Sequence, residues 1–471
     1  MDEKESTEKE RTIMRQFTDP NEKFQWLTTA PIPGLVAQLA VPTIISMLIT
    51  SIYNMADTYF VGTLGKSAQG AVSVVLPLMA VIQAIGFTFG NGAGNCVSRL
   101  LGQQKVEEAE TVAATGFFFG VFGGLVVTVL GELFLVPLVE LLGATETILP
   151  YAVDYARYIL IGAPWMIASL VLNNLLRFSG SATYAMVGIS AGGILNIILD
   201  PIFITILDLG AAGAALATIV SQMVSFLLLL FNTGRNGTIP VRWSRFRVRG
   251  GPIFDVIRGG LPSLYRQGLA SVATILLNWA AKPFGDAAIA AMGIVNKVAM
   301  FSGSAVIGFG QGFQPVCGFN YGAKLYHRVR EAFWFCVRVG TAFLVVVSAV
   351  VFLLSPQIVY RFQPMDGEVV ELGTAALRWA IVALPLLPYT VLNNMMLQTV
   401  GETARASILS MSRQGLFFIP VILILPRVLE FSGVMLAQPI ADVGSFLLAI
   451  PLSVGFLKKM RRLEEENPLQ K

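Results

Sequence analysis

The amino-acid sequence predicts an all-helical polytopic membrane protein: twelve transmembrane helices in two six-helix bundles, related by a pseudo-two-fold axis along the membrane normal. Hydrophobic residues make up 55% of the chain and charged residues only 13%, whereas a soluble domain carries about 25% charge. Apolar stretches long enough to cross a hydrocarbon layer of about 30 Å occur six times in each half of the chain. The two halves also repeat each other at a constant offset.

The internal repeat has an offset of 220 residues. Matching pairs include Pro42 and Pro262, 89–92 and 309–312, 173–174 and 393–394, and 225–228 and 445–448. One offset that survives across so many positions indicates two copies of one structural unit with few net insertions. Residues kept in both copies are therefore interpreted as scaffold, and residues present in only one copy become candidates for function.

The predicted spans follow the apolar segments in order. In the first copy they lie near residues 35–61, 69–98, 111–137, 151–176, 183–207 and 211–231. In the second copy they lie near residues 254–280, 287–319, 329–354, 370–398, 405–428 and 433–457. These segments are too long and too uniformly apolar for barrel strands. Because each copy has an even number of spans, both copies have the same orientation, which places the pseudo-two-fold axis along the membrane normal.

Lys and Arg residues predict the orientation. The face with both termini and the central break collects 23 of the 33 basic residues, and by the positive-inside rule this face is cytoplasmic. We expect a multi-pass protein of a bacterial or archaeal cytoplasmic membrane. Its predicted parts are a cytoplasmic N-terminal segment (1–30), an N-lobe (31–231), a basic cytoplasmic linker (232–253), a C-lobe (254–457) and a cytoplasmic C-terminal tail (458–471).

Several function classes are disfavoured by the sequence. The three cysteines lie in or beside apolar segments, the single histidine His327 lies in a polar loop, and no zinc-type spacing occurs. No GxxxxGK[ST] motif is present, so the chain carries no ATP motor of its own. We expect no enzyme, no structural metal, no cofactor and no nucleic-acid partner, because the net charge of +4 is spread over many loops. The chain is expected to be a monomer in the bilayer.

Two acidic residues inside the first copy have no counterpart in the second. Asp57 lies near the end of the first span and Asp200 near the end of the fifth. The positions 220 residues later hold Leu277 and Pro420. Because a charge inside a membrane span is costly and is a functional hypothesis by default, we predict that the ionisable chemistry lies in the first copy only.

The depth of these acids predicts one cluster in the outer half of the N-lobe. Asn196 and Asp200 are four residues apart and share a helix face, and Thr218 of the sixth span reaches a similar depth. Burial and a neighbouring carboxylate favour the protonated form of a carboxyl group, and the same oxygens suit sodium. The cluster with Asp57 thus predicts a site for H⁺ or Na⁺. The alternative is that both acids only cap broken helices near Pro201.

Pro201 directly follows Asp200 and favours a helix kink, because it cannot donate a backbone hydrogen bond. We interpret it as a hinge. The second copy instead carries Arg266, Lys297 and Arg338 within its spans, which either neutralise helix ends, reach an interface or face a central cleft. The predicted substrate cavity consists of Arg266, Met292, Met300 and Met395, since flexible thioethers adapt to varied apolar ligands; ordinary packing is the alternative for the methionines.

Several motifs together resemble the multidrug and toxic compound extrusion (MATE) family over almost the whole chain. They are Ala40–Ser46, Tyr53–Asp57, Asn196–Phe203, Gly310–Pro315 and Asn320–Gly322. The resemblance implies two six-helix lobes around a central cavity and export of organic cations against protons or sodium. It also implies that Asp57, Asn196, Asp200, Thr218 and Tyr155 form the cation site. A second-lobe coupling site typically has acids in the seventh and tenth spans. Here the seventh span has Arg266 and the middle of the tenth span has no acid, so the chain is more similar to the DinF- and MepA-like branches.

These expectations combine into a secondary active antiporter that exports organic cations or amphipathic drugs in exchange for inward protons or sodium. Two other transporter classes share six plus six spans. A lipid-linked oligosaccharide flippase would be favoured by a basic central cavity. A sugar-transporter-like facilitator usually has an Asp- and Arg-rich loop after the second span, where this chain has Ser98–Lys105.

Overall fold

The computed structural model describes residues 20–64, 66–235, 238–248, 250–363 and 367–466. These residues form helices and connecting turns, without a strand among them. Eleven of their helices are long and apolar enough to cross a membrane. Helix α10 (Gly251–Ala281) has similar length and lies beside them, but it is not among these eleven. The predictions for residues 1–19 and 467–471, at the two chain ends, fall outside the described residues.

The first copy forms one bundle, the N-lobe. It consists of α3 (Ile32–Gly62), α4 (Lys66–Gly102), α5 (Val106–Leu133), α6 (Leu135–Leu141), α7 (Leu149–Phe178), α8 (Ala182–Pro201), the π-helix η1 (Ile202–Ile206) and α9 (Gly210–Asn232). The buried α7 packs against α4, α5 and α9. The linker to the second copy contains the short helix η2 (Trp243–Arg245), whose Arg245 pairs with Glu107 and Glu110 of α5.

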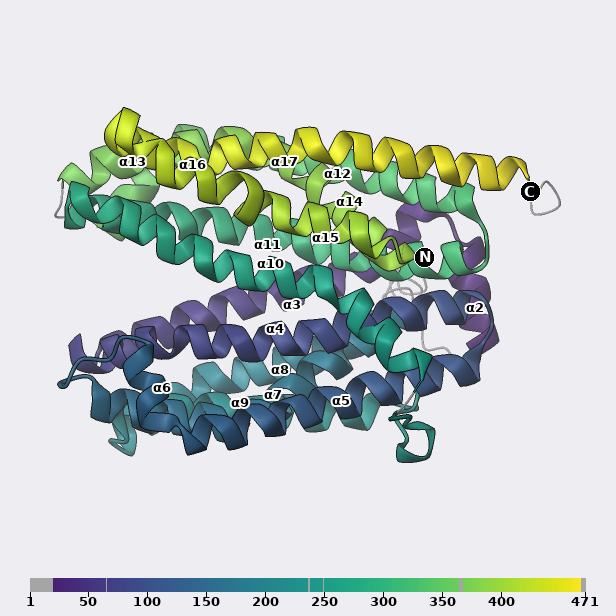
Figure 1. Cartoon of the computed structure of the whole chain (residues 1–471), viewed down its shortest axis with the longest axis horizontal. Coiled ribbons are helices and arrows are strands. Elements are labelled where there is room, and N and C mark those ends of the chain that lie inside the picture. Colours follow the sequence, from purple (N-terminus) through teal and green to yellow (C-terminus); the bar gives the residue numbers. More distant parts are fainter. Residues whose placement is uncertain (1–19, 65, 236–237, 249, 364–366, 467–471) are drawn as a thin grey trace, which may run out of the picture.

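The second copy forms the C-lobe, which lies beside the N-lobe with its helices running in nearly the same direction (Figure 1). It consists of α10, η3 (Lys282–Phe284), α11 (Asp286–Gly322), α12 (Tyr326–Phe362), α13 (Gly367–Ala383), η4 (Leu384–Leu386), α14 (Leu387–Val400), α15 (Thr403–Met411), the π-helix η5 (Ser412–Phe418), α16 (Ile419–Ile424) and α17 (Pro426–Glu465). Helix α17 is broken at Glu430, which has a φ of 52°.

The sequence repeat is also a structural repeat. The turns after α4 and α11 each place one non-glycine residue in the left-handed region, Gln104 with φ 60° and Lys324 with φ 61°. These two residues are 220 positions apart. A Cβ added to Gly322 would lie 3.0 Å from the Cα of Gly102, its own counterpart. Because a residue touches its counterpart only near the symmetry axis, the pseudo-two-fold axis passes between these two glycines.

Glycines bring the two lobes into backbone contact. A Cβ at Gly92 of α4 would lie 2.0 Å from the carbonyl oxygen of Val256 in α10. In the symmetry-related contact, a Cβ at Gly312 of α11 would lie 2.4 Å from the Cα of Ala40 in α3. Only glycine permits this approach. The glycines that recur in both copies therefore serve helix packing.

Hydrogen bonds also cross between the lobes, and we call this group of residues the inter-lobe seal: Asn91, Asn95 and Arg177 of the N-lobe with Ser263, Gln314 and Thr399 of the C-lobe. Asn91 Nδ2 donates to Ser263 Oγ (2.9 Å), Thr399 Oγ1 to Asn95 Oδ1 (2.9 Å), and Arg177 Nη1 to Gln314 Oε1 (2.9 Å). The seal lies in the half of the bundle that contains the end of α4 and the end of α7.

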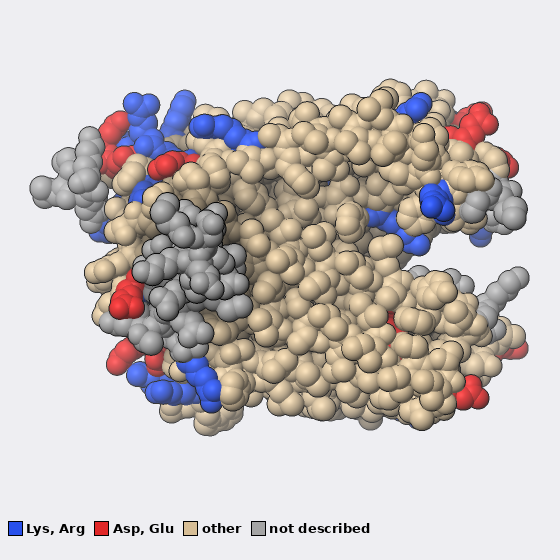
Figure 2. All heavy atoms as spheres, turned by 180° about the vertical axis from the view of Figure 1, so that it is seen from behind, with Lys and Arg blue, Asp and Glu red and all other residues tan. Residues whose placement is uncertain are grey.

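The two ends of the molecule differ. Figure 2 shows Lys and Arg gathered mainly at one end and a notch between the lobes at the other; we call these the basic end and the open end. Helix α2 (Pro20–Thr29) and the last turns of α17 lie at the basic end (Figure 1). Helix α2 contacts both lobes there, since Lys23 donates to Ser181 and Asn320 donates to the carbonyl oxygen of Leu27.

Candidate functional site

Asp57 lies on α3, near the open end of the N-lobe. It is half-buried, and its Oδ1 atom is buried without a hydrogen-bond partner among the described residues. Tyr53 lies one turn earlier on the same helix. The ring of Tyr53 rests on α8, where a Cβ added to Gly193 would be 3.0 Å away. The small residue on α8 therefore lets α3 bring its acid against that helix.

Asn196 and Asp200 lie one turn apart on α8, as their spacing predicts. Asn196 Nδ2 donates to Asp200 Oδ1 at 3.3 Å. Asp200 is 0% exposed. The other oxygens, Asn196 Oδ1 and Asp200 Oδ2, are buried and have no hydrogen-bond partner in the described part of the chain.

The structure brings the two acids together across α3 and α8. Asp57 lies close enough to act electrostatically on Asp200, and Tyr155 of α7 lies within the field of both carboxylates. Tyr155 is 1% exposed, and its hydroxyl faces the sulfur of Met79 at 3.8 Å. Tyr53, which Asp57 also influences, is a neighbour that the sequence analysis did not select. Its spacing of four residues from Asp57 was the signal that could have found it.

Thr218 is buried on α9, a helix that packs against α8. Its hydroxyl donates to the carbonyl oxygen of Ala214 on its own helix at 3.1 Å. The hydroxyl proton is therefore used within α9, and only the oxygen lone pairs remain available to a ligand. The structure thus leaves the role of Thr218 a prediction.

This cluster contains buried hydrogen-bond acceptors that lack a donor within the described chain. Three buried oxygens, Asp57 Oδ1, Asn196 Oδ1 and Asp200 Oδ2, have no donor among the described residues. Buried acceptors of this kind cost free energy unless a proton or a cation satisfies them. The described residues contain no group of three or more His, Cys, Asp or Glu that could hold a metal ion. An arrangement of two carboxylates and an amide suits a single proton or a hard monovalent cation.

Pro201 is the last residue of α8, and the π-helix η1 follows it directly. The fifth span therefore changes its hydrogen-bonding pattern immediately beside Asp200. In the C-lobe the corresponding span also contains a π-helix, η5. π-Helical segments are frequent at functional sites, and the hinge role of Pro201 remains a prediction.

The predicted substrate-cavity residues lie in different environments. Met292 and Met395 are buried in the C-lobe, with Met395 against Gly310, whereas Met300 is 66% exposed. Arg266 is partly buried on α10 and lies within electrostatic range of Arg177 in the inter-lobe seal. Their role in substrate binding is not decided by these positions.

The expectation that only the first copy holds membrane-embedded acids is wrong. Asp442 is buried on α17, where it accepts hydrogen bonds from Arg413 Nε at 2.6 Å and Gln438 Nε2 at 2.8 Å. Arg413 lies on the π-helix η5. Asp442 lies inside the predicted span 433–457, which is otherwise apolar. A charge inside a predicted span, the signal that identified Asp57, was therefore also available for Asp442. Asp442 differs from the N-lobe acids because an arginine neutralises it.

Comparisons with known proteins agree with this architecture. The MatE family model matches residues 42–202 and 262–424. Multidrug export protein MepA of Staphylococcus aureus (strain NCTC 8325 / PS 47) is 28% identical over 424 residues, covering 90% of this chain and 93% of the relative. MepA of Staphylococcus saprophyticus subsp. saprophyticus is 28% identical over 413 residues, covering 87% and 91%.

Solved structures with a similar fold include a MATE in complex with MaL6, with a TM-score of 0.88 and 26% identity, covering 94% of this chain and 99% of that one. Another is the outward-facing conformation of a multidrug resistance MATE family transporter of the MOP superfamily. Its TM-score is 0.86 at 26% identity, covering 94% and 100%.

Proposed function

Because the chain belongs to the MatE family, we propose that it is a multidrug efflux antiporter that exchanges organic cations or amphipathic drugs for inward protons or sodium. The proposal extends to this chain the multidrug export named for its relatives. The coupling ion binds at Asp57, Asn196 and Asp200. The observation that carries this assignment is the set of three buried acceptor oxygens that have no donor among the described residues.

The orientation follows from charge. We assign the basic end to the cytoplasm, because Lys and Arg concentrate there and cytoplasmic loops carry the excess of basic residues. The notch at the open end then faces outward, and the inter-lobe seal closes the cytoplasmic half. In this orientation Asp57 and Asp200 lie in the outer half of the membrane.

The proposed cycle starts when a proton or sodium ion enters from outside and binds at the acid pair. Binding removes net negative charge between α3 and α8, so the repulsion between Asp57 and Asp200 falls and α3 changes its packing on α8. The substrate cavity then changes shape and releases its cargo outward. The lobes subsequently part at the inter-lobe seal and expose the empty cavity to the cytoplasm.

The ion gradient supplies enough free energy for concentrative export. One charge that crosses a potential of 100 mV yields about 2.3 kcal/mol. A difference of one pH unit adds about 1.4 kcal/mol. For a neutral cargo exchanged against one proton, these terms together support a substrate gradient of roughly a few hundredfold. For a monovalent cation the same exchange moves no net charge, and the pH term alone supports a gradient of about tenfold.

The test is the replacement of Asp57→Asn and Asp200→Asn in the purified protein, reconstituted in liposomes. Each variant keeps a side chain of similar size but cannot be neutralised by an ion, so dye movement driven by a pH or sodium gradient is expected to fall to the level of empty liposomes. Asp154→Asn, which changes an exposed acid of α7, is the matched control and should transport normally.

Imposing the pH gradient and the sodium gradient separately identifies the coupling ion. Normal transport by a correctly inserted Asp57→Asn variant would contradict the site. Loss of transport in the Asp154→Asn control as well would show that removal of any acid in this region is harmful and would also reject the assignment.

One observation favours the flippase as a second candidate. Arg177 and Arg266 lie within electrostatic range of each other where the lobes meet, and neither forms an ion pair in the described part of the chain. Two uncompensated guanidinium groups attract an anionic cargo such as a lipid-linked pyrophosphate. Gradient-driven movement of such a lipid, with no movement of cationic dye, would select this function instead.

A further inference from the structure

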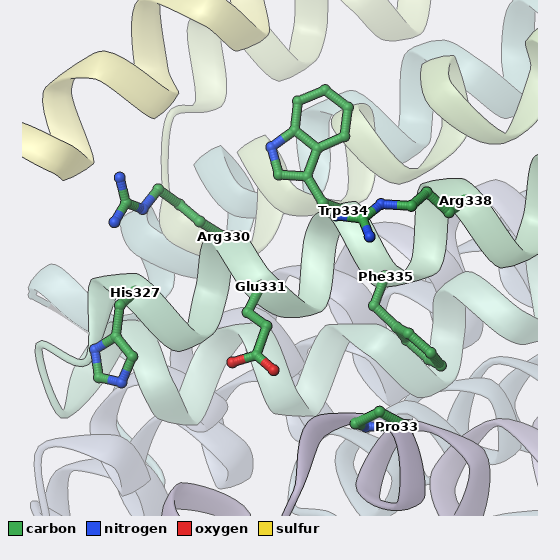
Figure 3. A pocket seen from close by; sticks show the side chains of 7 residues that line it. All are labelled: Pro33, His327, Arg330, Glu331, Trp334, Phe335 and Arg338. Carbon is green, nitrogen blue, oxygen red and sulfur yellow. The ribbon is translucent and has the colours of Figure 1, made fainter.

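A pocket of about 410 Å³ lies on the surface of α12, near the basic end and beside the first turn of α3. Figure 3 shows its wall. Four of the lining residues are spaced four, three and four positions apart along α12. They are His327, Glu331, Trp334 and Arg338. This spacing places them along one face of the helix. The face is exposed, and the Trp334 side chain is 40% exposed.

Arg338 is the deepest charge of this pocket. It lies twelve residues after the start of α12 at Tyr326, which corresponds to about 18 Å along the helix axis. It is exposed and forms no hydrogen bond or ion pair with any described residue. In Figure 3 its side chain runs back along α12 toward Trp334. An unpaired arginine on a lipid-facing surface is costly unless it reaches an anionic group at the interface.

Glu331 carries the opposite charge nearer the basic end. It lies seven residues before Arg338, or about 10 Å along the helix axis, and it is exposed without an ion pair or hydrogen bond in the described chain. Arg330, the neighbouring basic residue, is already paired with Glu464 of α17. Arg328 lies within electrostatic range of Glu331 but donates its hydrogen bonds to Asn320 and to the carbonyl oxygen of Ala30. The pocket therefore offers one unpaired positive group at depth and, closer to the water, one carboxylate whose oxygens accept no hydrogen bond from the described residues.

We propose that this pocket binds the head group of a phospholipid with a primary amine, a phosphatidylethanolamine, from the leaflet at the basic end. The phosphodiester lies against the Arg338 guanidinium and the indole N–H of Trp334, and the ammonium group lies against Glu331. In such a lipid the phosphate is closer to the hydrocarbon than the amine is. The order of the two charges along α12 matches that order, and the apolar faces of Phe335 and Pro33 are available to the glycerol and acyl region.

Other head groups fit this pair of charges less well. A phosphatidylglycerol satisfies Arg338 but has no cationic donor for the Glu331 carboxylate. A phosphatidylcholine carries a quaternary ammonium that cannot donate a hydrogen bond to Glu331. Because Pro33 belongs to α3 and the other lining residues to α12, a lipid in this pocket also contacts both copies of the repeat. The inference concerns a bound lipid and does not depend on which compound is transported.

The experiment uses the delipidated full-length protein in detergent and measures lipid binding by native mass spectrometry. Phosphatidylethanolamine, phosphatidylglycerol and phosphatidylcholine with identical acyl chains are titrated separately. We expect phosphatidylethanolamine to bind about tenfold more tightly than the other two, as one additional charge-assisted hydrogen bond predicts. Arg338→Gln should weaken both phosphatidylethanolamine and phosphatidylglycerol, whereas Glu331→Gln should abolish only the preference between them.

Two matched controls use exposed charges at the other end of the C-lobe. Arg361→Gln, on the same helix, and Glu371→Gln, on α13, should leave the binding of all three lipids unchanged. Equal binding of the three lipids to the native protein would overturn the proposal, and so would equal losses in the control variants. Binding of glycerophosphoethanolamine as tightly as the intact lipid would identify a site for a soluble phosphate ester instead and would also reject the lipid.

Discussion

Lys23 is a buried lysine at the basic end, where its amino group donates a hydrogen bond to Ser181. Burial lowers the pKa of this amino group to about 7, compared with about 10.4 in an unfolded chain. Between these two values the undocked helix binds more protons than the docked one. The docking of α2 is therefore expected to gain stability as the pH rises from about 7 to about 10, and to carry the full cost of burying a charge below about 7.

The substitution Lys23→Met removes this titration. Hydrogen exchange of the α2 amides, corrected for the intrinsic effect of pH, should show protection that increases from pH 7 to pH 9 in the native protein and stays constant in the variant. Lys105→Met, an exposed lysine at the same end, should retain the pH dependence. An identical slope in the native protein and in Lys23→Met would contradict the assignment.

The ion pair of Arg413 and Asp442 is expected to contribute to the stability of the C-lobe. Replacing Arg413→Met leaves a buried carboxylate without its cation, and the free energy of unfolding should fall by about 3–5 kcal/mol. The double variant Arg413→Met/Asp442→Leu should recover much of this loss, because both charges are then absent. Unfolding in mixed micelles measures both values. Arg405→Met, which breaks a partly exposed pair with Glu402 at 3.8 Å, should cost less than about 1 kcal/mol, because Glu402 keeps its contact with Lys459.

Single residues were predictable where the repeat served as a control. Asp57 and Asp200 were identified because their counterparts are apolar, and the structure brings them together. The same criterion also applies to Asp442, whose counterpart Gln222 is neutral, but the sequence prediction did not include this acid. Tyr53 was missed because a tyrosine inside an apolar span is ordinary in sequence, and its spacing of four residues from Asp57 becomes informative only beside an acid that is already identified.

The contact between α4 and α10 depends on Gly260, which has no side chain. A Cβ at Gly260 would lie 2.1 Å from the carbonyl oxygen of Thr88 in α4. Gly260→Ala must therefore push α4 and α10 apart, and transport is expected to fall by tenfold or more, since misplacement by about 1 Å has consequences of that size. Gly268→Ala is the control on the same helix, because its Cβ meets nothing within 4 Å.

Transport and the distance between labels on α4 and α10 would be measured for both glycine variants. Normal transport by Gly260→Ala, with an unchanged distance, would show that the contact adapts without cost. Loss of transport in Gly268→Ala would mean that α10 tolerates no substitution, and the close approach would not explain the result.

Most helices were predictable because length and hydropathy determine a membrane span. Most observed helices extend beyond the predicted segments at both ends, whereas the third, fifth and eleventh spans end one to four residues earlier than predicted. The π-helices η1 and η5 were not predictable, since one extra residue in a helical turn leaves the apolar pattern nearly unchanged. The break of α17 at Glu430 was also missed. Its counterpart is Gly210, which has a φ of 56°. A glycine indicates a possible left-handed turn in the first copy, whereas a glutamate at the same position of the second copy does not.

The state of the whole molecule depends on the inter-lobe seal. Arg177 donates to Gln314 across the lobes and to Asn91 and Asn174 within the N-lobe. Arg177→Met removes these donors and leaves buried amide oxygens unsatisfied, at a cost of about 1–3 kcal/mol. The population open at the basic end should therefore rise roughly tenfold or more. Spin-label distances across the basic end measure this shift.

Arg235→Met, an exposed arginine after α9, is the control for that measurement and should leave the distance distribution unchanged. An unchanged distribution in Arg177→Met would show that the glycine contacts alone hold the basic end closed. The two-lobe architecture followed from the repeat, but which end is closed did not, because that depends on side-chain contacts between helices that are far apart in the sequence.

The chemical nature of the inter-lobe seal has a consequence for how ions act on the protein. Its contacts across the lobes are hydrogen bonds, one of them from the Arg177 guanidinium to the Gln314 amide, and no ion pair joins the two lobes among the residues that the structure describes. Dissolved electrolyte weakens attractions between opposite charges most strongly, and the seal contains no pair of opposite charges. Exchanging potassium for sodium at constant ionic strength therefore reports on the acids near the open end, without a background from the opposite gate.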